Sequence, residues 1–320
     1  MKIDQSLKSI TNCYKNMSTF GKTLLFIGTL LILVVFFREM NSGSYKNQNQ
    51  NRIEGFEQNE QFKHLKGNDI YDDFYSNIYD HLVHNDTKNN FELTTILKVT
   101  NPSQKSVILD IGSGTGHHVG KLSEKKFNVT GIDISHSMIK QALQNYPKQK
   151  FIHGDVLDNH KFPLSTFTHI LSLYFTIYYI QDKRLFFDNC MDWLIPGGFL
   201  VVHLVEPYKF DPILPPGNPL YIVSPQKYAK QRITKTKVNF NKFVYNSNFD
   251  YDESNKIATF EEKFKFDDGK TRKQEQVLYM EDTDQIVAIA QQTGFTLHSK
   301  IDMVKCAYEY QYLYVFTKPA

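Results

Sequence analysis

The sequence is poor in cysteine, and its cysteines are not arranged in pairs. Cys13, Cys190 and Cys306 are the three cysteines among 320 residues, and no two of them form a C-x-x-C motif. A disulfide framework usually has an even number of cysteines, and zinc or redox sites usually have closely spaced pairs. We therefore expect neither a disulfide framework nor a metal site.

A large excess of charge of either sign is also absent. Lys and Arg number 37 against 34 Asp and Glu, which gives a net charge of +3 at pH 7. Proteins that bind nucleic acids usually concentrate positive charge on one face, so no nucleic-acid partner is expected. The content of 41% hydrophobic and 22% charged residues is that of a folded protein and excludes wholesale disorder. It leaves the oligomeric state open.

Long apolar runs are rare, and the one that is present lies near the N-terminus. The run from Thr23 to Phe37 carries no formal charge, has no polar stripe and is flanked by Lys22 and Arg38. It is shorter than the ~20 residues of a comfortable membrane span, but the flanking basic side chains can reach the membrane surface. A cleaved signal peptide is the alternative, which the long preceding segment and the absence of a small-residue cleavage site disfavour. We predict an uncleaved single-pass membrane anchor at residues 23–38, with the side of the membrane that the folded domain faces left open.

The chain around this run divides by composition. Residues 41–59 are rich in Asn and Gln and poor in apolar residues, which is typical of a solvated tether. The predicted parts are an N-terminal tail 1–22, the anchor 23–38, a polar tether 39–61 and a folded domain 62–320 with a core 107–206, an insertion 207–281 and a closing part 282–318.

The folded domain shows an alternation of strands and helices. Two helices are predicted before Asn101-Pro102, and apolar strands and amphipathic helices then alternate to Val205. The predicted strands are 107–111, 128–132, 151–154, 168–173 and 199–205, and the predicted helices between them are 116–125, 135–145 and 182–194. This alternation predicts a Rossmann-like, doubly wound α/β fold with a mostly parallel sheet.

After Glu206 the pattern changes. Several prolines are followed by segments with the alternation of antiparallel strands between residues 237 and 280, and Asp268-Gly269 is typical of a hairpin turn. A helix at 283–293 and strands at 295–303 and 310–317 follow. We therefore expect an antiparallel insertion after the fifth strand of the main sheet.

A glycine-rich loop follows the first predicted strand. The segment from Asp110 to Gly116 reads D-I-G-S-G-T-G, and its alternating glycines let the backbone turn tightly beside a ligand just before a helix begins. The NAD fingerprint G-x-G-x-x-G needs its third glycine one residue later, where His117 stands. The loop predicts nucleotide binding and disfavours an NAD-dependent oxidoreductase.

Acidic residues end two further strands. Asp133 follows the second strand, where a carboxylate can accept both hydroxyls of a ribose. Asp155 follows the third strand, where it can accept an exocyclic adenine amine. Either one alone is more often a helix cap or turn former. Together with Asp110 they lie at the edge where parallel sheets bind ligands.

In these segments the sequence resembles the class I S-adenosylmethionine-dependent methyltransferases, in the broad group that includes many small-molecule methyltransferases. The resemblance rests on Val107 to Gly116, Gly131 to Met138, His153 to Val156 and the L-x-P-G-G-like turn at Trp193 to Leu200. It implies S-adenosylmethionine as the cofactor. By this resemblance the residues that bind it are Asp110, Gly112, Ser113, Gly114, Gly116, Asp133, Ile134, Met138, Asp155, Val156, Leu173 and Tyr174. One departure is the Tyr178-Tyr179 pair, which stands where His-His is frequent.

The sequence says less about the molecule that accepts the methyl group. Methyl transfer from a sulfonium depends mainly on positioning, so a catalytic base is optional. His203 and Glu206 are the candidate bases, although a strand histidine is more often structural. Aromatic residues are the candidate contacts of the substrate: Tyr178, Tyr179, Tyr221, Tyr228 and Tyr245.

These features together predict a membrane-tethered methyltransferase. We expect it to act on a small-molecule or lipid-like acceptor and expect the insertion to select that acceptor. The alternatives are a methyltransferase of protein side chains and a membrane scaffold that binds the cofactor without turnover. For the insertion, the alternative is a dimerisation or stabilising flap.

Overall fold

The computed structural model describes residues 15, 17–23, 25–30, 32–33, 61–217 and 224–320. The chain divides into two units, Met1–Glu57 and Gln58–Ala320, which are described separately below. Most of the predicted tail 1–22 and all of the predicted tether except Gln61 fall outside the described residues.

The N-terminal unit contains short helical stretches. Residues 19–23, 25–30 and 32–33 are helical, and of the predicted anchor, residues 24, 31 and 34–38 lie outside the described part. Among the described residues, no helix is both long and apolar enough to cross a membrane. The predicted transmembrane helix therefore receives no support from this part of the chain.

The larger unit is built on a seven-stranded sheet in the order β11-β12-β6-β5-β2-β3-β4. Strands β2 to β6 are parallel, while β12 is antiparallel to both β6 and β11. Their bounds are β2 Val107–Ile111, β3 Asn128–Asp133, β4 Lys150–His153, β5 Phe167–Ser172, β6 Leu194–Val205, β11 Thr296–Asp302 and β12 Gln311–Thr317. The predicted Rossmann-like, mostly parallel sheet is confirmed.

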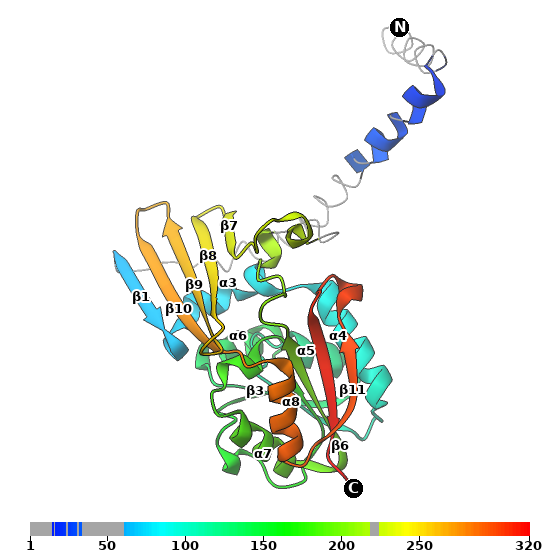
Figure 1. Cartoon of the computed structure of the whole chain (residues 1–320), viewed down its shortest axis with the longest axis vertical. Helices are drawn as coiled ribbons and strands as arrows, with labels where there is room; N and C mark the ends of the chain where they lie inside the picture. The colour runs from blue at the N-terminus through cyan, green and yellow to red at the C-terminus, as the bar shows by residue number, and fades with distance from the viewer. Residues whose placement is uncertain (1–14, 16, 24, 31, 34–60, 218–223) are drawn as a thin grey trace. The chain divides into compact units, whose positions relative to one another are not determined.

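Helices cover both faces of this sheet (Figure 1). They are α3 Asp73–Val83, α4 Asp86–Thr100, α5 His117–Glu124, α6 His136–Asn145, α7 Lys183–Trp193 and α8 Thr283–Gln292. Successive side chains of a strand point to opposite faces. In β6, Val201 accordingly packs in a core with Leu93 of α4, whereas Leu200 and Val202 pack in another core with Trp193 of α7. Both faces of the sheet are therefore buried, as expected for parallel strands.

A second sheet has five strands in the order β1-β10-β9-β8-β7. Its bounds are β1 Phe62–Lys66, β7 Lys235–Asn239, β8 Phe243–Asp252, β9 Ile257–Phe266 and β10 Thr271–Tyr279. The antiparallel insertion and its turn at Asp268-Gly269 are confirmed. The sequence analysis did not predict β1, which pairs in parallel with β10 although some two hundred residues separate them (Figure 1).

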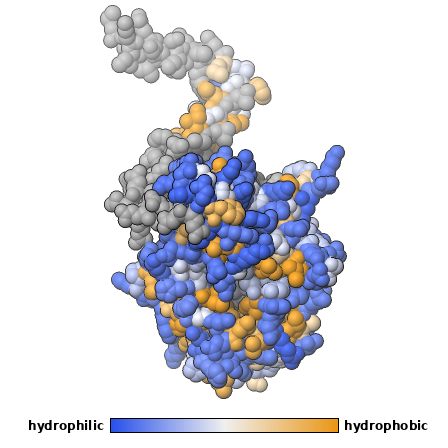
Figure 2. All heavy atoms as spheres, turned by 90° about the vertical axis from the view of Figure 1, so that its left-hand side faces the viewer, coloured by the Kyte–Doolittle hydropathy of each residue, from blue (hydrophilic) through white to orange (hydrophobic). Residues whose placement is uncertain are grey.

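The second sheet has one buried and one solvated face. In β10, Arg272, Gln274, Gln276 and Leu278 are buried, while the residues between them are partly or fully exposed. Figure 2 shows the molecule from the side on which this sheet lies, and hydrophilic residues prevail over scattered hydrophobic ones there. Because Arg272, Gln274 and Gln276 are buried, the buried face has an unusual share of polar side chains.

Candidate functional site

The glycine-rich loop joins β2 to α5 in a conformation that needs glycine. Gly112 and Gly116 have φ angles of +67° and +89°, a region that L-residues rarely adopt. A Cβ atom on Gly112 would overlap the side chain of Thr176, and one on Gly116 would lie 2.6 Å from the ring of Phe151. A Cβ on Gly114 would meet only Tyr79, at 3.8 Å. The loop is therefore packed tightly at Gly112 and Gly116 and is open at Gly114.

Asp110 lies at the end of β2 beneath this loop. Its side chain is buried, and its Oδ2 atom has no hydrogen-bond partner among the described residues. Burial raises the pKa of Asp110 to about 6, because burial disfavours the charged form. Together with Gly112 to Thr115 it lines a cavity, which we call the donor cavity. An unpartnered buried carboxylate oxygen suits a cationic ligand group, such as the amino group of S-adenosylmethionine.

Asp133 connects two loops of the site through hydrogen bonds. Its Oδ2 accepts a hydrogen bond from Gly114 N and its Oδ1 accepts one from Ser135 N, both at 2.9 Å. Burial raises the pKa of Asp133, and these two backbone donors oppose that shift. Each carboxylate oxygen has a second lone pair, so the side chain can still accept the ribose hydroxyls predicted for it.

Like Asp133, the predicted cofactor contacts Ile134, Met138, Asp155 and Val156 line neither of the cavities described in this section. Ile134 is 43% exposed and Met138 is 2% exposed. Asp155 is exposed and accepts a hydrogen bond from Leu157 N at 2.9 Å, while Val156 is partly buried. Their role in cofactor binding remains a prediction.

Helices α3 and α4 supply walls of the donor cavity that the sequence analysis missed. Asp80 accepts a hydrogen bond from Thr115 Oγ1 at 2.6 Å and contacts His117 Nε2 at 2.9 Å. His84 and Lys88 also line the cavity. Asp80 lies in α3, His84 follows that helix and Lys88 lies in α4, so no single helical repeat in the sequence identifies these three residues as one wall.

A buried charged cluster lies beside the donor cavity. Glu92 has no exposed surface, and its Oε2 contacts Lys88 Nζ at 2.8 Å and His118 Nε2 at 3.0 Å. Despite burial, the positive charge of Lys88 and the bond to His118 hold the pKa of Glu92 far below its usual range. His203 Nδ1 is 3.7 Å from Glu92 Oε1. The cluster joins α4, α5 and β6.

The two candidate bases do not reach a cavity. His203 has no exposed surface, bonds to Gln311 Oε1 through Nε2 at 3.1 Å, and has its pKa lowered to about 4 by burial. It lies behind the rings of Tyr174 and Phe175. Glu206 is partly buried and accepts a hydrogen bond from Thr283 Oγ1 at 3.4 Å. Neither side chain lines the donor cavity or the cavity beside it, so this geometry gives the predicted base role no support.

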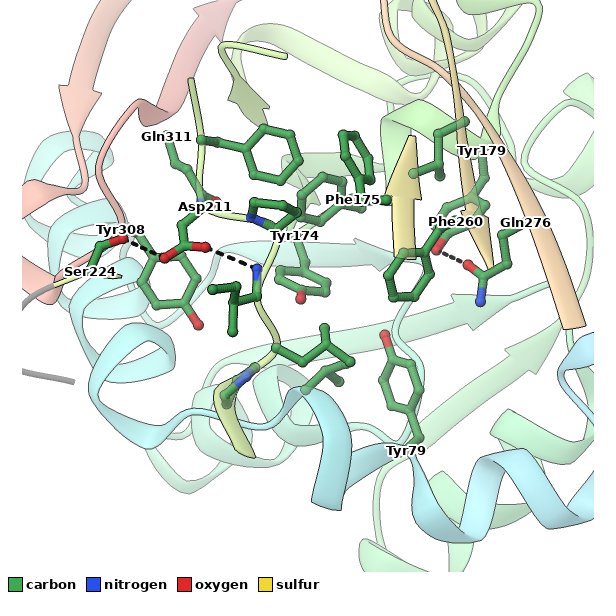
Figure 3. A pocket seen from close by; sticks show the side chains of 18 of the residues that line it. Tyr79, Tyr174, Phe175, Tyr179, Asp211, Ser224, Phe260, Gln276, Tyr308 and Gln311 are labelled. Carbon is green, nitrogen blue, oxygen red and sulfur yellow. Dashed lines mark hydrogen bonds between the residues drawn. The ribbon is translucent and has the colours of Figure 1, made fainter. Parts of the chain in front are cut away.

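The second cavity adjoins the donor cavity, and we call it the acceptor cavity. Five residues line both cavities: Tyr79, Val83, Tyr174, Phe175 and Tyr179. The acceptor cavity continues between the loop after β6 and the buried face of the second sheet. Figure 3 shows Phe260 and Gln276 on one side of it and Asp211 and Tyr308 on the other. The cavity is walled mainly by aromatic and aliphatic side chains.

The predicted substrate tyrosines have different positions. Tyr179 lines both cavities and donates a hydrogen bond to Gln276 Oε1 at 2.5 Å. Tyr178 and Tyr245 have no exposed surface, and their hydroxyls bond to Val205 N at 2.7 Å and Glu262 Oε1 at 2.7 Å. Tyr228 is 82% exposed and lines neither cavity. Tyr221 lies outside the described residues.

The buried positions of Tyr178 and Tyr245 correct the sequence-based expectation that they line the acceptor site. Their hydroxyl groups are satisfied within the protein, and their rings pack in the interior. Leu173 and Tyr174, predicted to form the floor after the fourth strand of the core, do line the donor cavity.

Comparison with known proteins agrees with the fold and the loop. Residues 109–202 match a family described as "Methyltransferase domain". A dTDP-4-amino-2,3,4,6-tetradeoxy-D-glucose N,N-dimethyltransferase of Saccharopolyspora spinosa is 30% identical over 37% of this chain and 47% of its own length. The chain thus spans less than half the length of this curated relative.

Two solved structures share the fold. An S-adenosylmethionine-dependent methyltransferase from Clostridium acetobutylicum aligns with a TM-score of 0.58 at 16% identity, over 77% of this chain and 98% of its own. CalS10, an amino pentose methyltransferase from Micromonospora echinaspora solved with S-adenosylmethionine bound, aligns with a TM-score of 0.51 at 18% identity, over 72% and 91%. Residues 109–202 therefore carry a methyltransferase domain, and the large unit has the fold of class I S-adenosylmethionine-dependent methyltransferases, which agrees with the predicted cofactor.

Proposed function

We propose that this protein transfers a methyl group from S-adenosylmethionine to a nitrogen atom of a small molecule bound in the acceptor cavity. The observation that carries the proposal is the wall shared by the two cavities, formed by Tyr79, Val83, Tyr174, Phe175 and Tyr179. A donor bound along the glycine-rich loop and an acceptor bound against the second sheet would meet at this wall.

Methyl transfer to a nitrogen atom needs little acid–base catalysis. The lone pair of the acceptor nitrogen forms the new N–CH3 bond while the C–S bond of the sulfonium breaks, and the proton leaves to water. Holding the two reactants in line and excluding water supplies most of the acceleration in such a displacement. This fits a shared wall of aromatic and aliphatic side chains and the burial of His203.

The names of two similar proteins support a nitrogen acceptor, although another relative is named an O-methyltransferase. The relative from Saccharopolyspora spinosa is named an N,N-dimethyltransferase of an amino sugar, and CalS10 is named an amino pentose methyltransferase. Their names concern small molecules, so we favour a small-molecule acceptor over a lipid or a protein side chain.

The test is incubation of a chain that begins at Gln58 with methyl-labelled S-adenosylmethionine and fractionated metabolites, lipids and proteins. We expect label in the small-molecule fraction. Label in the protein or lipid fraction would contradict the acceptor class, and cofactor binding without turnover in any fraction would favour the non-catalytic alternative.

We further propose that the insertion selects the acceptor. Phe260 of β9 lines the acceptor cavity, whereas Val277 of β10 points to the solvated face of the same sheet and is 40% exposed. Phe260→Leu should change the KM for the acceptor severalfold, while Val277→Ala, the matched control, should not. If subunit association changes in Phe260→Leu and acceptor kinetics do not, the insertion serves as an oligomer interface instead.

Membrane tethering through residues 23–38 is a separate proposal. It is supported by the uncharged run Thr23 to Phe37 and by the exposure of Phe26 and Ile32, at 67% and 69%. We expect the full chain to stay with membranes after an alkaline wash and the chain beginning at Gln58 to remain in the supernatant. Recovery of the uncleaved full chain in the supernatant would refute the tether.

A further inference from the structure

The acceptor cavity has a distinctive charge. Asp211, in the loop after β6, is the one charged side chain among the described residues that line it. No Lys, Arg or His of the described residues takes part in its wall. Segment 218–223, outside the described residues, reads N-P-L-Y-I-V and has no charged residue either. Among the described residues, the lining of the cavity therefore includes a negative group and no cation.

Asp211 is held in place by neutral donors. Its Oδ1 accepts hydrogen bonds from Ile213 N and Gln226 Nε2, both at 3.0 Å, and its Oδ2 accepts one from Ser224 Oγ (Figure 3). Within the part of the chain that the structure describes, it has no ion-pair partner within 4.0 Å. Donors of this kind orient a carboxylate without cancelling its charge.

The guanidinium of Arg232 does not line the acceptor cavity and is hydrogen-bonded to backbone carbonyl groups. Its two terminal nitrogens donate to the carbonyl oxygens of Pro207 and Phe210, each at 2.7 Å. The group also stacks on the rings of Phe210 and Phe249, whose centroids lie at 4.9 and 5.3 Å. Burial lowers the pKa of Arg232 and the negative charge of Asp211 opposes that shift, so Arg232 lies near Asp211 although it does not line the cavity.

The remaining wall is well suited to a cation. Aromatic faces attract organic cations within about 6 Å of the ring centroid, and Phe175, Phe210, Phe249 and Tyr308 line the cavity together with Asp211. A phosphate or diphosphate group, by contrast, is usually bound by arginine, lysine or a helix N-terminus. An anion placed here would face Asp211, and no basic side chain among the described lining residues would compensate it.

We propose that the acceptor is an organic cation without a phosphate group, and that Asp211 binds its cationic group while the methylated nitrogen lies at the wall shared with the donor cavity. A protonated amine has no lone pair, so the group bound by Asp211 and the atom that attacks the methyl group are different atoms of the acceptor. The inference rests on the proposed function and separates this chain from the curated relative, whose named substrate is a dTDP-linked sugar.

The test uses three probes with the same phenylethyl group and different charge, namely 2-phenylethylamine, 2-phenylethanol and 3-phenylpropanoate. Their binding to the full chain saturated with S-adenosylhomocysteine is measured by ligand-observed NMR titration. We expect the amine to bind at least tenfold more tightly than the propanoate, with the alcohol between them. Asp211→Asn should weaken amine binding about tenfold, the scale of a charge-assisted hydrogen bond, and leave alcohol binding within twofold.

Two further variants separate charge from structure. In Asp211→Asn, the amide oxygen can still accept from Ile213 N and the amide nitrogen can donate to Ser224 Oγ, so the loop should remain folded. Ser224→Ala removes one hydrogen bond but keeps the charge and should retain the preference for the amine. Asp192→Asn, an exposed carboxylate on α7, should change nothing.

Propanoate binding as tight as amine binding, or equal loss of amine and alcohol binding in Asp211→Asn, would overturn the proposal. Because the readout is binding, it is independent of turnover. A wild-type protein that prefers the amine but transfers no methyl group would refute the proposed function and leave the charge preference standing.

Discussion

The two sheets of the large unit build their cavities in different ways. At the seven-stranded sheet, the donor cavity is built around one short backbone segment, Gly112 to Thr115, which Asp133 holds and which side chains of α3 and α4 face. At the five-stranded sheet, the acceptor cavity is formed mainly by side chains from α3, the loop after β6 and three strands of that sheet, β8, β9 and β10. A cavity shaped by backbone tolerates few substitutions, whereas one shaped by side chains can change its ligand with single replacements.

The buried side chains of the two sheets also differ in polarity. Around the large sheet the cores are mostly apolar, with residues such as Trp193 and Leu200. On the buried face of the second sheet, Glu262 accepts hydrogen bonds from Tyr75, Tyr245, Gln274 and Gln276 at 2.6 to 3.1 Å. Such a network depends on every member being satisfied. The comparison predicts that variants in the two sheets have separable effects on donor and acceptor.

The largest effect is expected in the glycine-rich loop. Gly112→Ala places a methyl group against Thr176 at a left-handed φ and should lower the free energy of unfolding by about 2–4 kcal/mol. Gly114→Ala is the matched control, because its Cβ has open space; it should cost about 1–2 kcal/mol from backbone strain alone. Urea unfolding measures both, and equal destabilisation would show that packing against Thr176 does not matter.

The next effect concerns donor binding. Asp133→Ala should weaken S-adenosylmethionine binding by about 1.5–3 kcal/mol, because it removes charge-assisted hydrogen bonds to the ribose and frees Gly114 N. Calorimetric titration measures the affinity, and circular dichroism checks that the variant is folded. Acceptor-probe binding should stay within twofold. Wild-type donor affinity in a folded Asp133→Ala variant would remove this residue from the site.

A comparable change in the second sheet should act on the acceptor side. Glu262→Gln places an amide nitrogen toward side-chain donors and should lower the free energy of unfolding by about 1–3 kcal/mol. Its neighbour Glu261 lies on the solvated face and pairs with Lys273 at 2.7 Å, so Glu261→Gln should stay within about 0.5 kcal/mol. Acceptor KM should rise in Glu262→Gln while donor affinity is retained. A loss of donor affinity in Glu262→Gln would show that the two sheets are coupled.

The smallest effect is a pH dependence at Asp110. Since burial raises its pKa to about 6, the folded state holds this proton more tightly than the unfolded state does, and the contribution of Asp110 to stability is lost as the pH rises from about 4 to about 6. Donor binding should change in the opposite sense. Below pH 6 the neutral carboxyl no longer attracts the donor's amino group, and affinity should fall by up to about tenfold per pH unit. Asp110→Asn should flatten this profile between pH 5 and 7, and a flat wild-type profile would exclude the contact.

Much of the large sheet could be predicted from the sequence because its signals are local. The strand at Val107–Ile111 is apolar except for Asp110, and the glycines that follow have conformations that few other residues adopt. Asp110 and Asp133 could be placed at one edge of the sheet because the carboxyl ends of parallel strands meet there.

The remaining features depend on partners that are distant in the sequence. The strand Phe62–Lys66 pairs with residues 271–275, and no local pattern identifies that partner. His203 looked like a candidate base because it stands near the end of a strand. Its burial results from packing against Gln311 and Glu92, which come from β12 and α4. Asp211 was not singled out because one acid in a proline-rich loop carries no local signal.

The parallel pairing of β1 with β10 has a consequence for synthesis on the ribosome. The strand at the start of the folded domain cannot find its partner until Thr271–Tyr279 has emerged, so the five-stranded sheet forms late, after most of the core strands have been made. Until then the edge of β1 is open to other chains, and its charged ends, Lys63 and Lys66, are of the kind that discourages such contacts. In the finished protein, a pulling force on the segment before Phe62 would load the hydrogen bonds to β10, the strand that carries Gln276 into the acceptor cavity.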